Sequence, residues 1–285
     1  MIEFRVLGPF EVVKHGRVLA LGSPQQRALL AVLLLHRGEV VSVDRLIDAL
    51  WGEQAPPTAI KIVQGYVSGL RKALGEGLLA TRGRGYVLAR LPGELDADCF
   101  ESLVAEGRRA LEEGDARAGA ERLRDALVLW RGPALADFAY ERFAQGEIAR
   151  LDEMRLTALE DRIDADLALG KHAELVAELG ELVRDYPQRE RLQGQMMLAL
   201  YRSRRQADAL ERYQRARGHL IAELGIEPGP ALKKLERAIL VHDPALEPPS
   251  REPERPAARA AWRVRRGGVL IGVGGGLPNV GGAEV

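Results

Sequence analysis

Thr58 to Leu74 reads TAIKIVQGYVSGLRKAL, and Leu78 to Leu88 reads LLATRGRGYVL. The two stretches predict a helix that begins after Pro56-Pro57 and ends before Gly75, followed by a β-hairpin. On a helical wheel, one face of the helix is apolar and the opposite face is small, polar or basic. The apolar face carries Ala59, Val63, Tyr66, Val67, Leu70 and Leu74. The opposite face carries Lys61, Gln64, Gly65, Ser68 and Lys72, with Thr58 at its N-terminal end. We therefore expect the first face to be buried and the second to be presented outward.

Acidic side chains are nearly missing around this helix and hairpin. Residues 54–93 contain a single acidic residue, Glu76, although charged residues make up 29% of the chain. The same window holds six cations, which are Lys61, Arg71, Lys72, Arg82, Arg84 and Arg90. Acidic groups would repel DNA phosphates, whereas Lys and Arg release counterions when they contact them. The pattern predicts a surface for double-stranded DNA.

The segment before this helix completes a small α+β domain. Phe4 to Val13 and Arg17 to Leu21 predict two or three short strands. The sequence Ser23-Pro24-Gln25-Gln26 is a capping box with proline at the first helical position, so a helix is expected to begin there and to end at Gly38. A second helix is expected from about Val43 to Trp51. Three helices and a terminal hairpin make a winged helix-turn-helix over residues 1–92.

The turn of the hairpin is expected at Arg82-Gly83-Arg84-Gly85. The glycines permit positive φ, and the arginines project from the tip. Such a wing reaches the minor groove or phosphates while the helix enters the major groove. Two alternatives remain open: the turn is an ordinary solvated loop, and Gly65 and Gly69 relieve packing instead of permitting close approach to DNA.

Tyr66 to Leu74 and Thr81 to Tyr86 resemble the response-regulator type of winged helix, and the strands before the first helix fit that subtype. The chain departs from many relatives at Ser68 and Gly69, where they have arginine. The resemblance favours Arg82 for the minor groove and Arg84 for phosphate. The face of the helix and this resemblance together give the expected DNA-binding residues: Thr58, Lys61, Gln64, Tyr66, Ser68, Arg71, Lys72, Arg82 and Arg84.

Residues 93–244 predict a second, all-helical domain. Helices are expected at about 97–112, 115–130, 141–169, 171–185, 188–202, 205–223 and 228–241. The tetrad Lys171-His172-Ala173-Glu174 recurs 34 residues later as Arg205-Gln206-Ala207-Asp208, and this is the length of a tetratricopeptide helix pair. We expect small Ala173 and Ala207 to let paired helices approach. Such arrays leave a groove for a partner or for another protomer.

Three further segments carry a second resemblance. Leu129 to Asp137, Ala199 to Leu210 and Glu223 to Gly229 look like the bacterial transcriptional activator domain. A winged helix followed by this domain resembles the Streptomyces antibiotic regulatory protein family over roughly residues 1–244. The resemblance implies an activator, commonly of an antibiotic biosynthetic cluster. It also implies two protomers on direct repeats in promoter DNA and engagement of the RNA polymerase holoenzyme. The single cysteine fits a reducing cytosol, and we expect the protein in the cytoplasm, associated with the nucleoid.

Net charge separates the predicted parts. Residues 1–92 carry +5, residues 93–244 carry −7 and residues 245–285 carry +2, and the whole chain is neutral. A basic first domain on an acidic second one favours DNA contact by the first domain alone. The last part is rich in proline and glycine and is expected to be a disordered tail. Its glycine run at 267–276 lacks the Lys-Ser/Thr of a phosphate loop, so nucleotide binding is rejected.

No catalytic or metal-binding pattern stands out. The five histidines are scattered, and Cys99 is expected to be a small buried hydrophobe. Acidic pairs such as Glu160-Asp161 fit solvated helix faces, and no apolar run is long enough to span a membrane. We expect no enzyme activity, no cofactor and no metal. Two other classes stay open: a helical-repeat scaffold with a protein-binding winged helix and, with less support, an enzyme.

Overall fold

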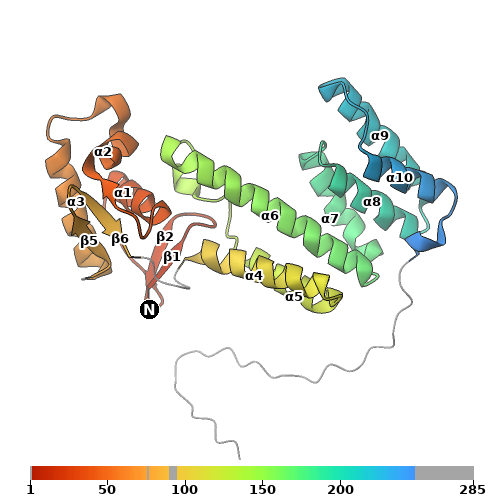
Figure 1. Cartoon of the computed structure of the whole chain (residues 1–285), viewed down its shortest axis with the longest axis horizontal. Helices are drawn as coiled ribbons and strands as arrows, with labels where there is room; N and C mark the ends of the chain where they lie inside the picture. Colours follow the sequence, from red (N-terminus) through yellow and green to blue (C-terminus); the bar gives the residue numbers. More distant parts are fainter. Residues whose placement is uncertain (1, 76, 90–94, 248–285) are drawn as a thin grey trace, which may run out of the picture. The chain divides into compact units, whose positions relative to one another are not determined.

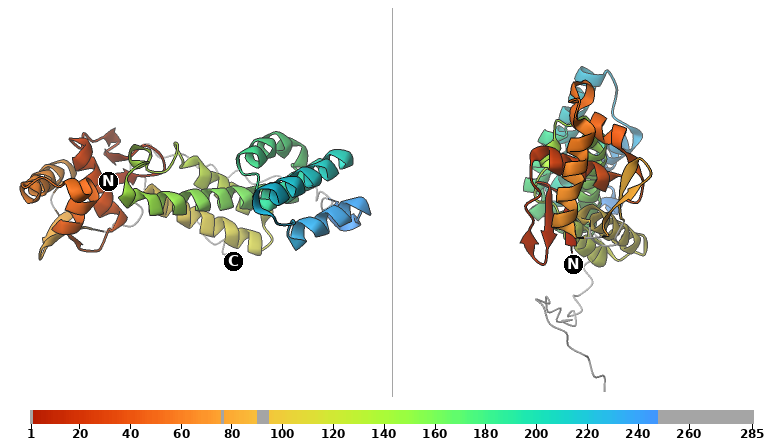
Figure 2. Two further views of the ribbon diagram at one scale, coloured as in Figure 1. Left: turned by 90° about the horizontal axis from the view of Figure 1, so that it is seen from above. Right: turned by 90° about the vertical axis from the view of Figure 1, so that its left-hand side faces the viewer.

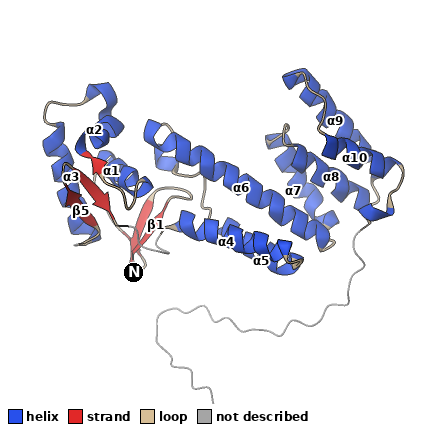
Figure 3. Cartoon of the chain, in the orientation of Figure 1, coloured by secondary structure: helices blue, strands red, loops and turns tan. Residues whose placement is uncertain are grey.

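The computed structural model describes residues 2–75, 77–89 and 95–247 (Figure 1). The expected fold class is confirmed, because a small α+β region precedes an all-helical one (Figure 3). The first region contains β1 (Ile2–Arg5), β2 (Glu11–Lys14), β3 (Arg17–Val18), α1 (Pro24–Leu35), β4 (Val41–Ser42), α2 (Val43–Trp51), α3 (Ala59–Leu74), β5 (Leu79–Arg82) and β6 (Gly85–Leu88). A short 3-10 turn, η1 (Gly52–Gln54), follows α2.

Two three-stranded antiparallel sheets flank the three helices of the first region. The first has the order β1-β2-β3, and the second has the order β4-β6-β5. β4 was not expected from the sequence, because it is only two residues long and runs directly into α2. The cap of α1 agrees with expectation, since the Ser23 hydroxyl accepts a hydrogen bond from the Gln26 amide at 3.3 Å. All residues of α1 from Ala28 to Leu34 are buried, so this helix is the centre of the core.

The helical region follows the expected helices within a few residues at each end. It contains α4 (Asp96–Glu112), α5 (Ala116–Val128), η2 (Ala136–Phe138), α6 (Arg142–Ala168), α7 (His172–Asp185), α8 (Glu190–Arg202), α9 (Gln206–Leu224), α10 (Pro230–Leu240) and η3 (Pro244–Leu246). α4, α5 and α6 pack on one another, and α8 packs on α6, α7, α9 and α10. The expected tail lies outside the described residues from residue 248 on.

The repeat has the expected period but uses other residues for packing. α7 and α9 begin 34 residues apart, at His172 and Gln206. Ala173 and Ala207 are both exposed, so the expectation that they bring paired helices together is wrong. Leu175 and Ala209, two residues further along each helix, are the buried positions. A four-residue match fixes the period of a helix pair, but it leaves open which positions face inward.

α6 carries a buried band of charged side chains. Glu160 is 4% exposed and Asp161 is 8% exposed, so the expectation of solvated faces is wrong for this pair. The physical reason is that α6 is covered by α5 on one side and by α7 and α8 on the other. Asp161 accepts hydrogen bonds from Arg108 of α4 and Arg191 of α8, both at 2.7 Å. Ion pairs thus replace the water that these carboxylates lose on burial.

The chain segment between β1 and β2 is held by the helical region. Asp96 accepts hydrogen bonds from the amides of Val6 and Leu7 at 2.8 and 3.1 Å. Asp137 accepts from the amide of Phe10 at 2.5 Å, and the rings of Phe10 and Phe138 lie 5.4 Å apart. One hydrophobic core therefore runs from β1 to Ala158 of α6.

Candidate nucleic-acid interface

The outward face of α3 is the centre of the candidate interface. In the right-hand view of Figure 2, α3 faces the viewer with the β5–β6 hairpin beside it. Ala59, Val63, Val67, Leu70 and Leu74 are buried, as the wheel predicts. The outward side chains are exposed, namely Lys61, Gln64, Ser68 and Lys72, with Thr58 at the helix start. The structure therefore brings these five expected site residues onto one face.

The two glycines of α3 have different surroundings. A Cβ added at Gly65 would meet no atom within 4 Å, so this position is open to a partner. A Cβ at Gly69 would lie 2.6 Å from Nε2 of Gln26, at the N-terminus of α1. Gly69 therefore leaves room for the end of the Gln26 side chain, in line with the packing alternative given above, whereas the surface at Gly65 is open for close approach to DNA.

Arg71 is engaged by the hairpin. Its Nε donates to the Leu79 carbonyl at 2.9 Å, and its Nη2 donates to the Thr81 hydroxyl at 2.8 Å. Its guanidinium carbon also lies 5.9 Å from the centre of the Tyr86 ring. These bonds hold β5 against the end of α3, so Arg71 positions the wing. The expected contact of Arg71 with DNA stays a prediction.

Tyr66 also lies apart from the outward face. It is half-buried and packs against the core that contains α1 and the hairpin. The helical wheel predicts Tyr66 on the apolar face, and its partial burial agrees with that placement. The expected contact of Tyr66 with DNA stays a prediction.

The tip of the wing presents two arginines. Arg82 and Gly85 are paired at the end of the β5–β6 ladder, so Gly83 and Arg84 form a two-residue turn. Gly83 has φ +55°, and Arg82, Gly83 and Arg84 are all exposed. Within the described part of the chain, Lys61, Lys72, Arg82 and Arg84 form no ion pair, so their charges are available to an anionic partner. Arg90 lies outside the described residues.

Sequence reasoning missed three parts of this site. Nζ of Lys14 donates to the Leu74 carbonyl at 2.9 Å and caps the last turn of α3 from β2. Gly85 of β6 lies against the Val41 carbonyl of β4, and an added Cβ would lie 2.4 Å from that oxygen. The lack of a side chain at Gly85 therefore lets the wing pack closely on β4. Ile60, the second residue of α3, is 54% exposed. The helical wheel could have found Ile60, whereas the other two depend on contacts between distant segments.

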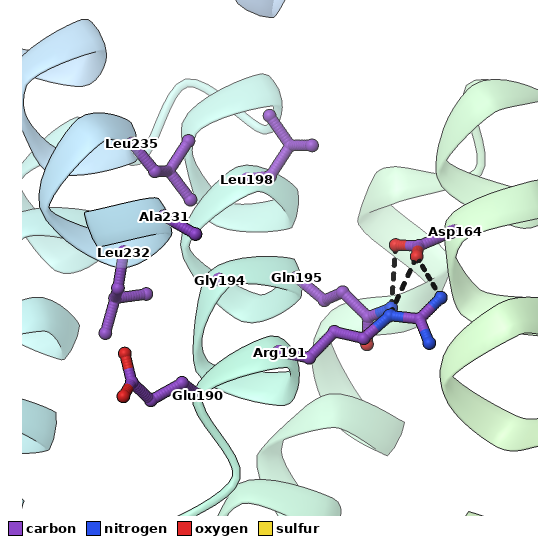
Figure 4. A pocket seen from close by; sticks show the side chains of 9 residues that line it. All are labelled: Asp164, Glu190, Arg191, Gly194, Gln195, Leu198, Ala231, Leu232 and Leu235. Carbon is purple, nitrogen blue, oxygen red and sulfur yellow. Dashed lines mark hydrogen bonds and ion pairs between the residues drawn. The ribbon is translucent and has the colours of Figure 1, made fainter. Parts of the chain in front are cut away.

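A groove in the helical region is lined by charged and apolar side chains. It has a volume of about 340 Å³ and is bounded by α6, α8 and α10. Arg191 and Gln195 of α8 reach Asp164 of α6, with Nε2 of Gln195 at 2.7 Å from Oδ1 of Asp164 (Figure 4). Leu232 and Leu235 of α10 form the apolar side. The groove has no thiol, hydroxyl or imidazole among its lining residues.

The thiol of Cys99 is not activated as a nucleophile. Cys99 is half-buried, and burial together with the charge of Asp98 raises the pKa of its thiol. A raised pKa disfavours the thiolate that a nucleophile requires. Among the described residues, no group of three or more His, Cys, Asp or Glu side chains is arranged to hold a metal ion. None of the described helices has the length and apolarity needed to cross a membrane.

Comparison with known proteins assigns both regions. Residues 16–88 match the family model "Transcriptional regulatory protein, C terminal", and residues 95–240 match "Bacterial transcriptional activator domain". The chain is 39% identical over 268 residues to the regulatory protein DnrI of Streptomyces peucetius, and the match covers 90% of this chain and 98% of DnrI. The chain belongs to the Streptomyces antibiotic regulatory protein family. This membership confirms the resemblance noted in the sequence.

Two further relatives of this chain are longer proteins. The chain is 46% identical over 246 residues to the regulatory protein AfsR of Streptomyces coelicolor, and it spans only 25% of AfsR. Among solved structures, Mycobacterium tuberculosis EmbR in complex with a low affinity phosphopeptide superposes with a TM-score of 0.82 at 36% identity. That match covers 85% of this chain and 66% of the EmbR chain. The matched proteins and families are named as regulators and not as enzymes.

Proposed function

We propose that this chain is a DNA-binding transcriptional activator, with the winged helix of residues 1–92 as the DNA-binding part. One observation supports this most strongly: the outward face of α3 and the wing tip are exposed, basic and free of acidic side chains. α3 has the width to enter the major groove, and the wing lies where a side chain reaches phosphate or the adjacent minor groove. Thr58, Lys61, Gln64, Ser68, Lys72, Arg82 and Arg84 are the proposed contacts.

The proposal extends to the acidic helical region and to its partners. Its charge of −7 over residues 93–244 opposes phosphate contact and leaves this region for protein contacts. Family membership favours two protomers on direct repeats of promoter DNA, engagement of the RNA polymerase holoenzyme and control of an antibiotic cluster. On this proposal the protein acts in the cytoplasm on the nucleoid. Transcription with purified polymerase tests it, and no rise in transcript from a promoter saturated with the chain would contradict activation.

Lys72→Ala is expected to weaken binding to the upstream intergenic DNA of the chain's own gene. A phosphate contact adds about 0.9 to the slope of log K against log salt, so the slope falls by about one unit. Gel shifts over a series of salt concentrations measure this change. Lys234→Ala, which removes an exposed lysine of α10, is the matched control and leaves the slope unchanged. Equal slopes for wild type and Lys72→Ala would show that Lys72 does not meet phosphate.

Arg82→Ala is expected to cost about 1–3 kcal/mol of binding free energy, mostly at sites with A·T-rich flanks. The narrow minor groove of A·T-rich DNA has the strongest negative potential and attracts an inserted arginine. Binding curves on probes that differ only in their flanks measure the effect. Arg84→Ala is the control at the same turn and lowers affinity equally for all flanks. A flank-independent loss for Arg82→Ala would place Arg82 on the backbone instead.

A further inference from the structure

Ile60 is a large apolar side chain on the outward side of α3. The described residues before β5 expose three large hydrophobic side chains: Val18 at 63%, Val40 at 57% and Ile60 at 54%. Of these, only Ile60 belongs to α3. Its neighbours on the outward face are Lys61 and Gln64, both exposed and polar. Ile60 is therefore isolated among polar groups and does not form part of a broad apolar patch of the kind that binds proteins.

The position of Ile60 in the helix suits contact with base edges. Ile60 is the second residue of α3, and Gln64 follows four residues later, so the two side chains lie one above the other on the same face. In helix-turn-helix proteins, the N-terminal residues of the recognition helix are those that reach the bases. Ser68 continues the same row one turn further on.

The chemistry of the major groove restricts what an isoleucine can recognise there. Guanine, cytosine and adenine present hydrogen-bond donors and acceptors, and thymine adds the C5-methyl group. An alkyl side chain offers no hydrogen bond, and it would deprive a polar base edge of water without replacing it. We infer that Ile60 contacts a thymine methyl group in the major groove and selects thymine at that position. This inference rests on the proposed DNA-binding function.

Replacing thymine by uracil throughout the probe tests the inference without knowledge of the operator. The upstream intergenic DNA is amplified once with dTTP and once with dUTP, and uracil pairs as thymine does but lacks the methyl group. Full-length wild type is expected to bind the thymine probe about fourfold more tightly, the factor for one buried methyl group. Ile60→Ala is expected to bring this thymine-to-uracil ratio close to one. Ile60→Val, which keeps a branched alkyl group, retains a ratio above one.

Val18→Ala, which shortens an exposed valine on β3, is the matched control and keeps the wild-type ratio. A ratio that stays the same in Ile60→Ala, with both probes still bound, would overturn the inference and leave the proposed function standing. A wild-type ratio of one would also overturn it. If wild type binds neither probe at low salt, the proposed DNA-binding function fails, and the inference fails with it. Circular dichroism of each variant confirms that the fold is retained.

Discussion

A fragment that ends at residue 92 is expected to lose its fold and its DNA binding, whereas one that ends at residue 170 is expected to keep both. The shorter fragment lacks Asp96 and Asp137, which accept hydrogen bonds from the amides of Val6, Leu7 and Phe10. Without these carboxylates the three amides bond to water instead, so each loses about 0.5–1.5 kcal/mol of net hydrogen-bond stabilisation. Together they come to about 1.5–4.5 kcal/mol, a large part of the roughly 5–15 kcal/mol by which a whole domain is stable.

The shorter fragment also loses apolar cover. Phe10 is 1% exposed and packs on Phe138, while Leu7 is fully buried in the same core. The longer fragment retains α4, α5 and α6, which complete that core up to Ala158. Thermal unfolding followed by circular dichroism and gel shifts on the upstream DNA compare the two fragments with the full chain. A cooperative transition and full affinity for the fragment 1–92 would show that the shared contacts are dispensable.

Asp166→Ala is expected to destabilise the helical region by about 3–5 kcal/mol, the usual cost of removing one partner of a buried ion pair. Asp166 is 2% exposed, and it pairs with Arg162 at 3.3 Å, with Lys171 at 3.1 Å and with Arg124. Its loss leaves the guanidinium of Arg162, which is 8% exposed, without one of its two carboxylates. At roughly 2–4 °C per kcal/mol for a region of this size, the melting temperature falls by about 10 °C.

The control for this substitution is Asp208→Ala. Asp208 pairs with Arg205 on the surface at 2.6 Å, where both side chains are about half exposed. Exposed pairs contribute about 0–1 kcal/mol, so the melting temperature is expected to change little. Equal effects of Asp166→Ala and Asp208→Ala would show that the buried position confers no special stability.

The effect of Asp166 is also expected to depend on pH. Burial acts to raise the pKa of Asp166, but hydrogen bonds from Lys171 and Arg124 outweigh it, and the pKa is lowered. A carboxyl whose pKa is lower in the folded state stabilises the fold at pH values above its unfolded pKa of about 3.9. This stabilisation is lost as the pH falls through the pKa of the folded state. The difference in stability between wild type and Asp166→Ala is therefore constant near neutral pH and shrinks below about pH 4.

The features that could be predicted from the sequence are those that depend on helical periodicity and on the residues that cap or end a helix. The buried face of α3, the capping hydroxyl of Ser23 and the ends of α7 and α9 follow from residues within one helix or its cap. The exposed cations of the candidate interface were predictable for the same reason, since a helical wheel separates Lys61 and Lys72 from the core.

Features that depend on distant segments were not predictable. Arg71 has the charge of a DNA-binding residue, and only the fold shows that its donors meet Leu79 and Thr81. Glu160 has the polarity of a surface residue, and only the packing of α6 shows that burial raises its pKa beside Arg189 and Arg191. In both cases the charged side chain meets partners inside the protein, which residue type alone does not reveal.

On the proposed DNA-binding function, the bonds from Arg71 to the hairpin have a consequence for binding and dissociation. Because β5 is fastened to the C-terminal half of α3, the wing and the helix approach a duplex as one preformed surface. The conformational entropy of ordering the wing is lost during folding and not during docking, which favours tight binding. The same bonds fix the distance between the two proposed groove contacts. A complex with a duplex whose groove geometry is altered between these contacts would therefore dissociate faster. It would do so in one step, without a partly bound state in which only the wing has dissociated.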